Sequence, residues 1–134
     1  MRVAGRRSSA IIGMLGLALA AASCGTLLEK AVRSPIIESG AVTFRLRAPS
    51  ARTVQLAGDW PENNWAAGDA DAGEILVGLM EKGKEDVWAI TLRLEPGRYR
   101  YRFLIDETRW TLDPENPRIV DDGKGGKANL VIVP

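Results

Sequence analysis

Histidine is absent from this chain of 134 residues, and cysteine occurs once, as Cys24. The missing imidazole excludes Ser-His-Asp and Cys-His catalytic arrangements and metal sites built on histidine. A single cysteine also excludes an internal disulfide. The 18 basic and 17 acidic residues nearly cancel, so the composition gives no indication of a nucleic-acid ligand. A chain of this length folds as one domain, so we expect a single small domain. Because histidine is absent and cysteine occurs once, we also expect that this domain is not an enzyme and needs no cofactor.

Long hydrophobic runs are also lacking. The longest apolar run, residues 10–22, has about 13 residues, whereas a membrane-spanning helix needs about 20. Arg2, Arg6 and Arg7 precede this run, and the small residues Ala21-Ala22-Ser23 follow it. That order of basic, apolar and small-residue segments is typical of a signal peptide. We therefore predict a signal peptide over residues 1–23.

The sequence Ala21-Ala22-Ser23-Cys24 resembles the lipobox of bacterial lipoproteins. The resemblance implies that Cys24 is the diacylated mature N-terminus, so that lipid would anchor the chain to a membrane of the cell envelope. Gly25 is not a retention-type aspartate, so the outer membrane is the default location where the cell has one. The alternative is an ordinary signal peptide followed by an incidental thiol.

Turn-forming residues divide the rest of the chain into short segments. Residues 24–40 have no period-2 pattern and contain Ser34-Pro35 and Ser39-Gly40, so we predict a tether there. Over residues 41–134 we predict about seven short strands: 42–47, 53–57, 75–80, 88–94, 98–106, 110–112 and 130–133. Since no long helical period accompanies them, the sequence predicts an all-β domain, an antiparallel sandwich.

Two strongly alternating segments predict which side chains are buried. Trp88 shares its strand face with Ile90 and Leu92, so we expect Trp88 in the core. In the segment 98–106, aromatic and aliphatic side chains occupy one face. The opposite face of that segment carries Arg98, Arg100 and Arg102. Alternating arginines are usually a solvated strand face, but they leave an acidic partner open.

Carboxylates are the remaining candidates for catalysis or for binding a metal. The candidates in the polar loops are Asp59, Glu62, Asp69, Asp71 and Glu74. Two of them could serve in glycoside hydrolysis, yet nothing in the surrounding sequence would desolvate one and raise its pKa. Asp69 and Asp71 also lack the further ligands of an EF-hand calcium loop. The sequence therefore favours a solvated loop, with no catalytic residue and no metal site.

Four tryptophans are many for a domain of this size. Trp60 lies at a strand end, and we expect it in the core or at its rim. Trp65 and Trp110 follow runs of polar residues, where no strand period would bury them. The flat apolar face of an exposed indole matches the C–H face of a pyranose ring. We therefore predict that Trp65 and Trp110 stack on a sugar; packing at the rim of the domain is the alternative.

The order of several motifs resembles that in family 48 carbohydrate-binding modules. These are the glycogen-binding domains of AMP-activated kinase β subunits and the N-terminal modules of isoamylases and branching enzymes. The matching segments are Val42–Pro49, Val54–Trp60, Trp65, Trp88, Pro96–Asp106, Trp110, Asp113-Pro114, Asn116-Pro117 and Gly126–Asn129. Together they cover about residues 41–134, although the loops before Trp65 and Trp110 are longer here than is usual in the family.

The resemblance implies an early-set immunoglobulin-like sandwich that binds α-1,4-glucan chains. Trp65 and Trp110 match the positions that stack on glucose. Arg102, and Asn129 in the loop before the last strand, match positions that hydrogen-bond the sugar hydroxyls. The leading hypothesis is therefore a membrane-anchored lipoprotein that binds an α-glucan polysaccharide or oligosaccharide. The runner-up is a protein-interaction or structural envelope module with a degenerate sugar site, docking a partner enzyme or another envelope component.

Overall fold

The computed structural model describes residues 32–67 and 76–134. The predicted signal peptide, Cys24, residues 25–31 of the predicted tether, and the acids Asp69, Asp71 and Glu74 lie outside the described residues. The elements are β1 (Ile36–Glu38), β2 (Ala41–Arg47), β3 (Val54–Gly58), η1 (Asn64–Ala66), β4 (Glu81–Lys82), η3 (Lys84–Asp86), β5 (Val87–Arg93), β6 (Gly97–Ile105), β7 (Arg109–Thr111), β8 (Ile119–Asp121) and β9 (Lys127–Val133). Neither described stretch contains a helix long and apolar enough to cross a membrane.

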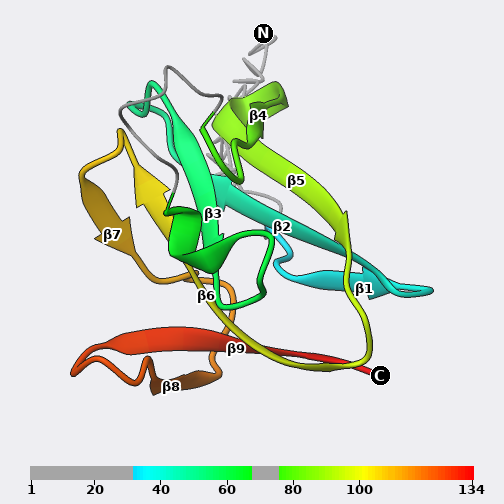
Figure 1. Cartoon of the computed structure of the whole chain (residues 1–134). Coiled ribbons are helices and arrows are strands. Elements are labelled where there is room, and N and C mark those ends of the chain that lie inside the picture. Colours follow the sequence, from blue (N-terminus) through cyan, green and yellow to red (C-terminus); the bar gives the residue numbers. More distant parts are fainter. Residues whose placement is uncertain (1–31, 68–75) are drawn as a thin grey trace, which may run out of the picture.

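The strands form two antiparallel sheets that pack as a sandwich (Figure 1). One sheet has the order β1-β2-β5-β4, and the other has the order β3-β6-β9-β8 with β7 paired to β6. The long strand β6 organises the second sheet, because β3 pairs along one of its edges while β9 and β7 share the other. The prediction of an all-β, immunoglobulin-like antiparallel sandwich is confirmed.

Alternate side chains of the two sheets fill the core between them. From β2 and β6 the buried side chains are Val42, Phe44, Leu46, Tyr101, Phe103 and Ile105. Trp88 is 6% exposed and its indole N–H donates to the carbonyl oxygen of Ala48 at 3.1 Å, which satisfies its one polar atom. Trp60 is 5% exposed and stacks beside Phe44. The predicted core positions of Trp88 and Trp60 are thus confirmed.

A buried polar cluster joins β6 and β9 to the connection between β7 and β8. The Tyr101 hydroxyl donates to Asp113 Oδ2 at 2.7 Å and accepts from Asn116 Nδ2 at 3.0 Å. Asn129 Oδ1 accepts the Asp113 backbone N–H at 2.7 Å, and its Nδ2 donates to the Asn116 carbonyl at 3.0 Å. Burial raises the pKa of Asp113, and burial beside this carboxylate raises the pKa of Tyr101. These side-chain hydrogen bonds hold the connection between β7 and β8 in place, although it forms no strand pairing.

The tether prediction is wrong for its last residues, because Ile36–Glu38 forms strand β1. This strand pairs with β2 through a tight turn in which Ser39 and Gly40 have φ of 49° and 80°. Ser34 is also buried, and its hydroxyl accepts the Arg45 backbone N–H at 3.0 Å. Three residues are too few to display a period-2 pattern, so only the turn at Ser39-Gly40 could be predicted.

Val32 and Arg33, where the described chain begins, line a surface hollow together with Arg45 and Ala89. Arg45 alternates with the buried Phe44 and therefore lies on the outer face of the four-stranded sheet.

The predicted strand over residues 75–80 is also wrong. Among its described residues only Leu79 makes a strand contact, an isolated bridge to Gln55. Gly78 adopts a positive φ of 69° just before it, and an added Cβ there would lie 2.2 Å from the carbonyl oxygen of Leu56. A backbone turned this way cannot continue a strand, and the next strand, β4, pairs with β5 in the other sheet.

Candidate functional site

Arg102 lies at the centre of the candidate site, on the outward face of the five-stranded sheet. In β6 its neighbours Tyr101 and Phe103 point into the core, so Arg102 points away from it. The guanidinium carbon lies 5.2 Å from the ring centroid of Trp65 and 4.8 Å from that of Trp110. Both distances are within the range of cation–π contacts. Three of the four residues that the sequence predicts to bind sugar therefore lie together.

Trp110 reaches this site from β7. It is the cross-strand partner of Leu104 in β6, and Leu104 shares the outward strand face with Arg102. The indole is 46% exposed, whereas Leu104 beside it is 9% exposed. The exposed face of Trp110 is a large apolar surface in contact with water, and it lies next to a cation.

Trp65 reaches the site from a short loop that Asn63 holds against β3. Asn63 is 4% exposed. Its Oδ1 accepts the backbone N–H of Gly58 at 2.7 Å and of Ala66 at 2.9 Å, while its Nδ2 donates to the carbonyl oxygen of Leu56 at 2.7 Å. One side chain thus connects both flanks of the Trp65 turn to the end of β3.

The turn itself has an unfavourable backbone. Asn64, Trp65 and Ala66 have φ of 42°, 59° and 56°, the left-handed region that non-glycine residues occupy infrequently. The bonds made by Asn63 offset this cost. The role of Asn63 was not predicted, although an asparagine following a proline turn is a frequent local hydrogen-bonding residue.

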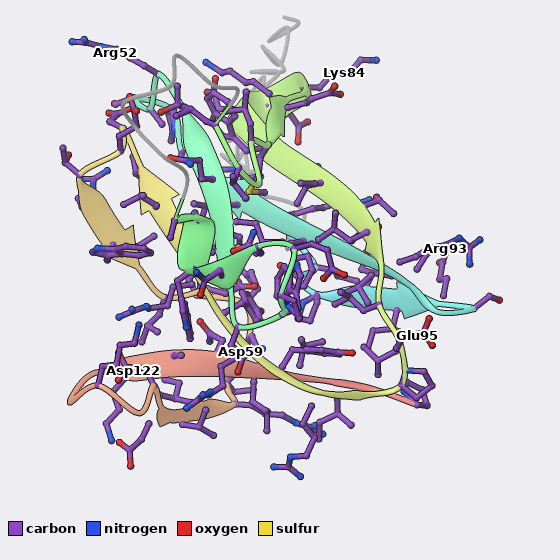
Figure 2. All side chains as sticks on the ribbon, in the orientation of Figure 1. Arg52, Asp59, Lys84, Arg93, Glu95 and Asp122 are labelled. Atoms are coloured by element: carbon purple, nitrogen blue, oxygen red, sulfur yellow. The ribbon has the colours of Figure 1, made fainter. Side chains whose placement is uncertain are left out.

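The charge of Arg102 is balanced by Asp122. Asp122 lies in the turn between β8 and β9 (Figure 2). Arg102 Nη1 lies 3.4 Å from Asp122 Oδ2, and the two side chains are 21% and 5% exposed. Asp122 Oδ1 accepts the backbone N–H groups of Lys124 and Gly126 at 2.6 and 2.9 Å. The Gly126 and Lys124 N–H groups hold the pKa of Asp122 below its usual range. The carboxylate therefore remains ionised opposite the guanidinium.

Arg100 is paired in the same way with Asp59. Its backbone N–H and its Nε donate to the two carboxylate oxygens of Asp59 at 3.0 and 2.9 Å. Of the arginines on this strand face, two are therefore each matched by an aspartate. A row of such pairs is not the uncompensated positive surface that would attract an acidic partner.

Asn129 does not join the other predicted site residues. The predicted loop position is wrong, because Asn129 lies inside β9, and its side chain is fully buried in the polar cluster beneath Asp113 and Asn116. Its amide already bonds to the backbone on both sides. A direct contact with a ligand would require this cluster to open, so we leave Asn129 out of the proposed site.

The described residues show no arrangement suited to catalysis. Asp59 is occupied by Arg100, and Glu62 is exposed in the loop before Trp65. Within residues 32–67 and 76–134, no group of three acidic, cysteine or histidine side chains could hold a metal ion. What the site does offer is two indole faces beside a neutralised guanidinium, which suits a ligand with apolar faces and hydroxyl groups.

Comparison with known proteins also indicates a carbohydrate-binding domain. The family model described as "Glycogen recognition site of AMP-activated protein kinase" matches residues 41–134. A stretch of 54 residues, 40% of this chain, is 39% identical to Protein PTST homolog 2, chloroplastic, from Arabidopsis thaliana. The match covers 10% of that protein, so the chain spans only a small part of its relative. Since the family model covers most of the chain and all the residues of the site, this protein belongs to the family of carbohydrate-binding modules represented by the glycogen recognition site of AMP-activated protein kinase.

Proposed function

We propose that this domain binds α-glucan chains of the glycogen or starch type without cutting them. Trp65 and Trp110 would stack on glucose rings, and the terminal nitrogens of Arg102 would donate hydrogen bonds to hydroxyl groups. The observation that carries the proposal is the placement of one guanidinium within 5.2 Å of both indoles on a single outward face. The Nε of Arg102 is buried and has no hydrogen-bond partner among the described residues, so only the terminal nitrogens are free to serve.

The charges around the site support a neutral ligand. Asp122 compensates Arg102, and Asp59 compensates Arg100 on the same strand face. A neutral glucan has no charge for salt to screen, so its affinity should be nearly independent of ionic strength. An anionic partner would instead show a steep decrease of binding with added salt. This difference separates the glucan hypothesis from the runner-up, a module that docks an acidic protein.

The decisive experiment measures binding of maltoheptaose by calorimetry and retention on insoluble starch and glycogen. Trp110→Ala should weaken binding by about 1–2 kcal/mol, on the order of tenfold in Kd. Ile119→Ala is the matched control, because Ile119 is also exposed, at 52%, but lies outside the site. If the protein is folded by circular dichroism yet binds none of the three glucans, the sugar site is absent and the interaction module replaces this proposal.

We further propose that the domain is displayed at the cell envelope as a lipoprotein. The support is the short apolar run over residues 10–22 and the lone Cys24 after three small residues. A diacyl anchor at Cys24 would hold the domain at the membrane surface, by default at the outer membrane.

A further inference from the structure

We infer that Asp122 is the positioning residue of the sugar site, which orients Arg102 between the indoles and keeps the site selective for uncharged glucans. The inference rests on the proposed function and extends it to a residue in a different element. Asp122 lies in the turn after β8, whereas Arg102 lies in the middle of β6, so the sequence gives no sign that they meet.

The two carboxylate oxygens of Asp122 have separate tasks. Oδ1 is used within the turn, where it accepts the N–H groups of Lys124 and Gly126, and the Asp122 N–H donates to the Gly126 carbonyl at 3.0 Å. Oδ2 points toward Arg102. Because Oδ1 fixes the carboxylate to the backbone of its own turn, Oδ2 is a fixed point against which a long, flexible arginine side chain can be oriented.

The surroundings of Arg102 show why it needs this fixed point. Its Nε has no hydrogen-bond partner among the described residues, and its two neighbours on the other sides are the indoles of Trp65 and Trp110. Aromatic faces attract a cation but set its direction weakly, since the attraction covers the whole ring. The ion pair with Asp122 Oδ2 holds the Nη1 end of this guanidinium close to one fixed point.

Gly126 keeps the approach to this contact open. A Cβ added at Gly126 would lie 2.7 Å from Asp122 Oδ2 and 3.6 Å from Arg102 Nη1. A methyl group there would displace the carboxylate while leaving its charge intact. The turn therefore offers two independent ways to disturb the same contact: removing the charge with Asp122→Asn, or moving it with Gly126→Ala.

The same pairing explains selectivity against charged ligands. With Asp122 ionised, the pair has no net charge, and a phosphorylated or sulfated glucan would bring an anion close to a carboxylate. Without Asp122, the guanidinium becomes an uncompensated cation between two stacking surfaces. Asp122→Asn should therefore lose affinity for neutral maltoheptaose and acquire salt-dependent binding of a sulfated maltodextrin.

The test compares wild type, Asp122→Asn, Gly126→Ala and the control Asp121→Asn. Asp121 is the adjacent acid, but its side chain is 83% exposed and its carboxylate contacts Lys127 instead. Asp122→Asn should weaken maltoheptaose binding about fivefold, and Gly126→Ala by a similar factor, whereas Asp121→Asn should bind like wild type. The double variant Arg102→Gln/Asp122→Asn should bind maltoheptaose as strongly as Arg102→Gln alone, because the two residues act as a unit. Additive losses would overturn the inference.

A second measurement is independent of sugar. Release of Arg102 should leave Trp65 and Trp110 more accessible to acrylamide, so fluorescence quenching should increase in Asp122→Asn and not in Asp121→Asn. Unchanged quenching and unchanged binding in Asp122→Asn would overturn the role of Asp122, even if wild type binds glucan. If neither wild type nor any variant binds glucan but quenching still increases in Asp122→Asn, the proposed function fails while the positioning of Arg102 by Asp122 stands.

Discussion

Asn63→Ala should reduce both the stability of the domain and its affinity for glucan. The substitution removes three hydrogen bonds of 2.7–2.9 Å around a side chain that is 4% exposed. At about 1 kcal/mol for each bond, the free energy of unfolding should fall by about 3 kcal/mol. For a domain of this size that corresponds to a decrease in Tm of roughly 10–25 °C.

The effect on binding follows from the backbone of the Trp65 turn. Without the bonds from Asn63, the backbone hydrogen bonds within the turn must hold three consecutive residues with positive φ, so the turn should relax and carry the indole away from Arg102. At a temperature where the variant is still folded, maltoheptaose affinity should fall as far as in Trp65→Ala, on the order of tenfold.

The assay combines thermal unfolding by circular dichroism with calorimetry at about 10 °C, well below the lowered Tm. Glu62→Ala is the control, because Glu62 is exposed in the same loop. A lowered Tm with unchanged affinity would show that Asn63 stabilises the fold without placing Trp65. An unchanged Tm would refute the reasoning altogether, because three buried hydrogen bonds would then contribute nothing.

Three further predictions concern the core, the response to acid and the N-terminus. Trp88→Ala should cost about 3–5 kcal/mol of stability, whereas Trp65→Ala should leave Tm nearly unchanged; equal destabilisation in thermal melts would contradict the assignment of Trp65 to the surface. The N–H groups of Thr53 and Arg52 lower the pKa of Asp106, so its contribution to stability is present above the ordinary pKa of about 3.9 and is lost as pH falls through the lower folded-state pKa. Asp106→Asn should therefore make Tm fall less steeply between about pH 5 and about pH 2. A plot of Tm against pH parallel to that of wild type would contradict this prediction. Cys24→Ser should move the protein from the membrane fraction to the soluble fraction; an uncleaved protein that stays with the membrane would show that residues 10–22 act as the anchor.

Strand periodicity predicted much of this fold because period-2 burial is a local property. It placed Trp88 in the core, and in the segment 98–106 it put Arg102 on the face opposite the aromatic side chains, as the structure has them. It did not find β1, whose three residues are too short for a pattern, and it placed a strand over residues 75–80, where the positive φ of Gly78 prevents one. Local pattern is a weak guide where a single backbone angle decides the path of the chain.

The candidate site was predictable only where side-chain chemistry alone marked a residue. Polar runs before the indoles suggested Trp65 and Trp110, strand alternation put Arg102 on the polar face of its strand, and the family resemblance linked Arg102 to the two indoles. Asn129 was misplaced because its partners lie 13 and 16 residues away in sequence, and a polar side chain in a strand looks the same whether it faces water or a buried carbonyl. Asp122 was missed for a related reason, since its partner lies on another strand.

The two outer faces of the sandwich have different roles. Val32 and Arg33 enter beside Arg45 and Ala89, on the outer face of the four-stranded sheet, while the indoles lie on the outer face of the other sheet. The described chain therefore begins at the back of the domain, and the two indoles lie on the opposite side. If the lipid anchor that we propose is joined to the domain through Val32, a branched polysaccharide can reach the indoles without passing between the domain and the membrane. The thickness of the sandwich would then separate the indoles from the membrane.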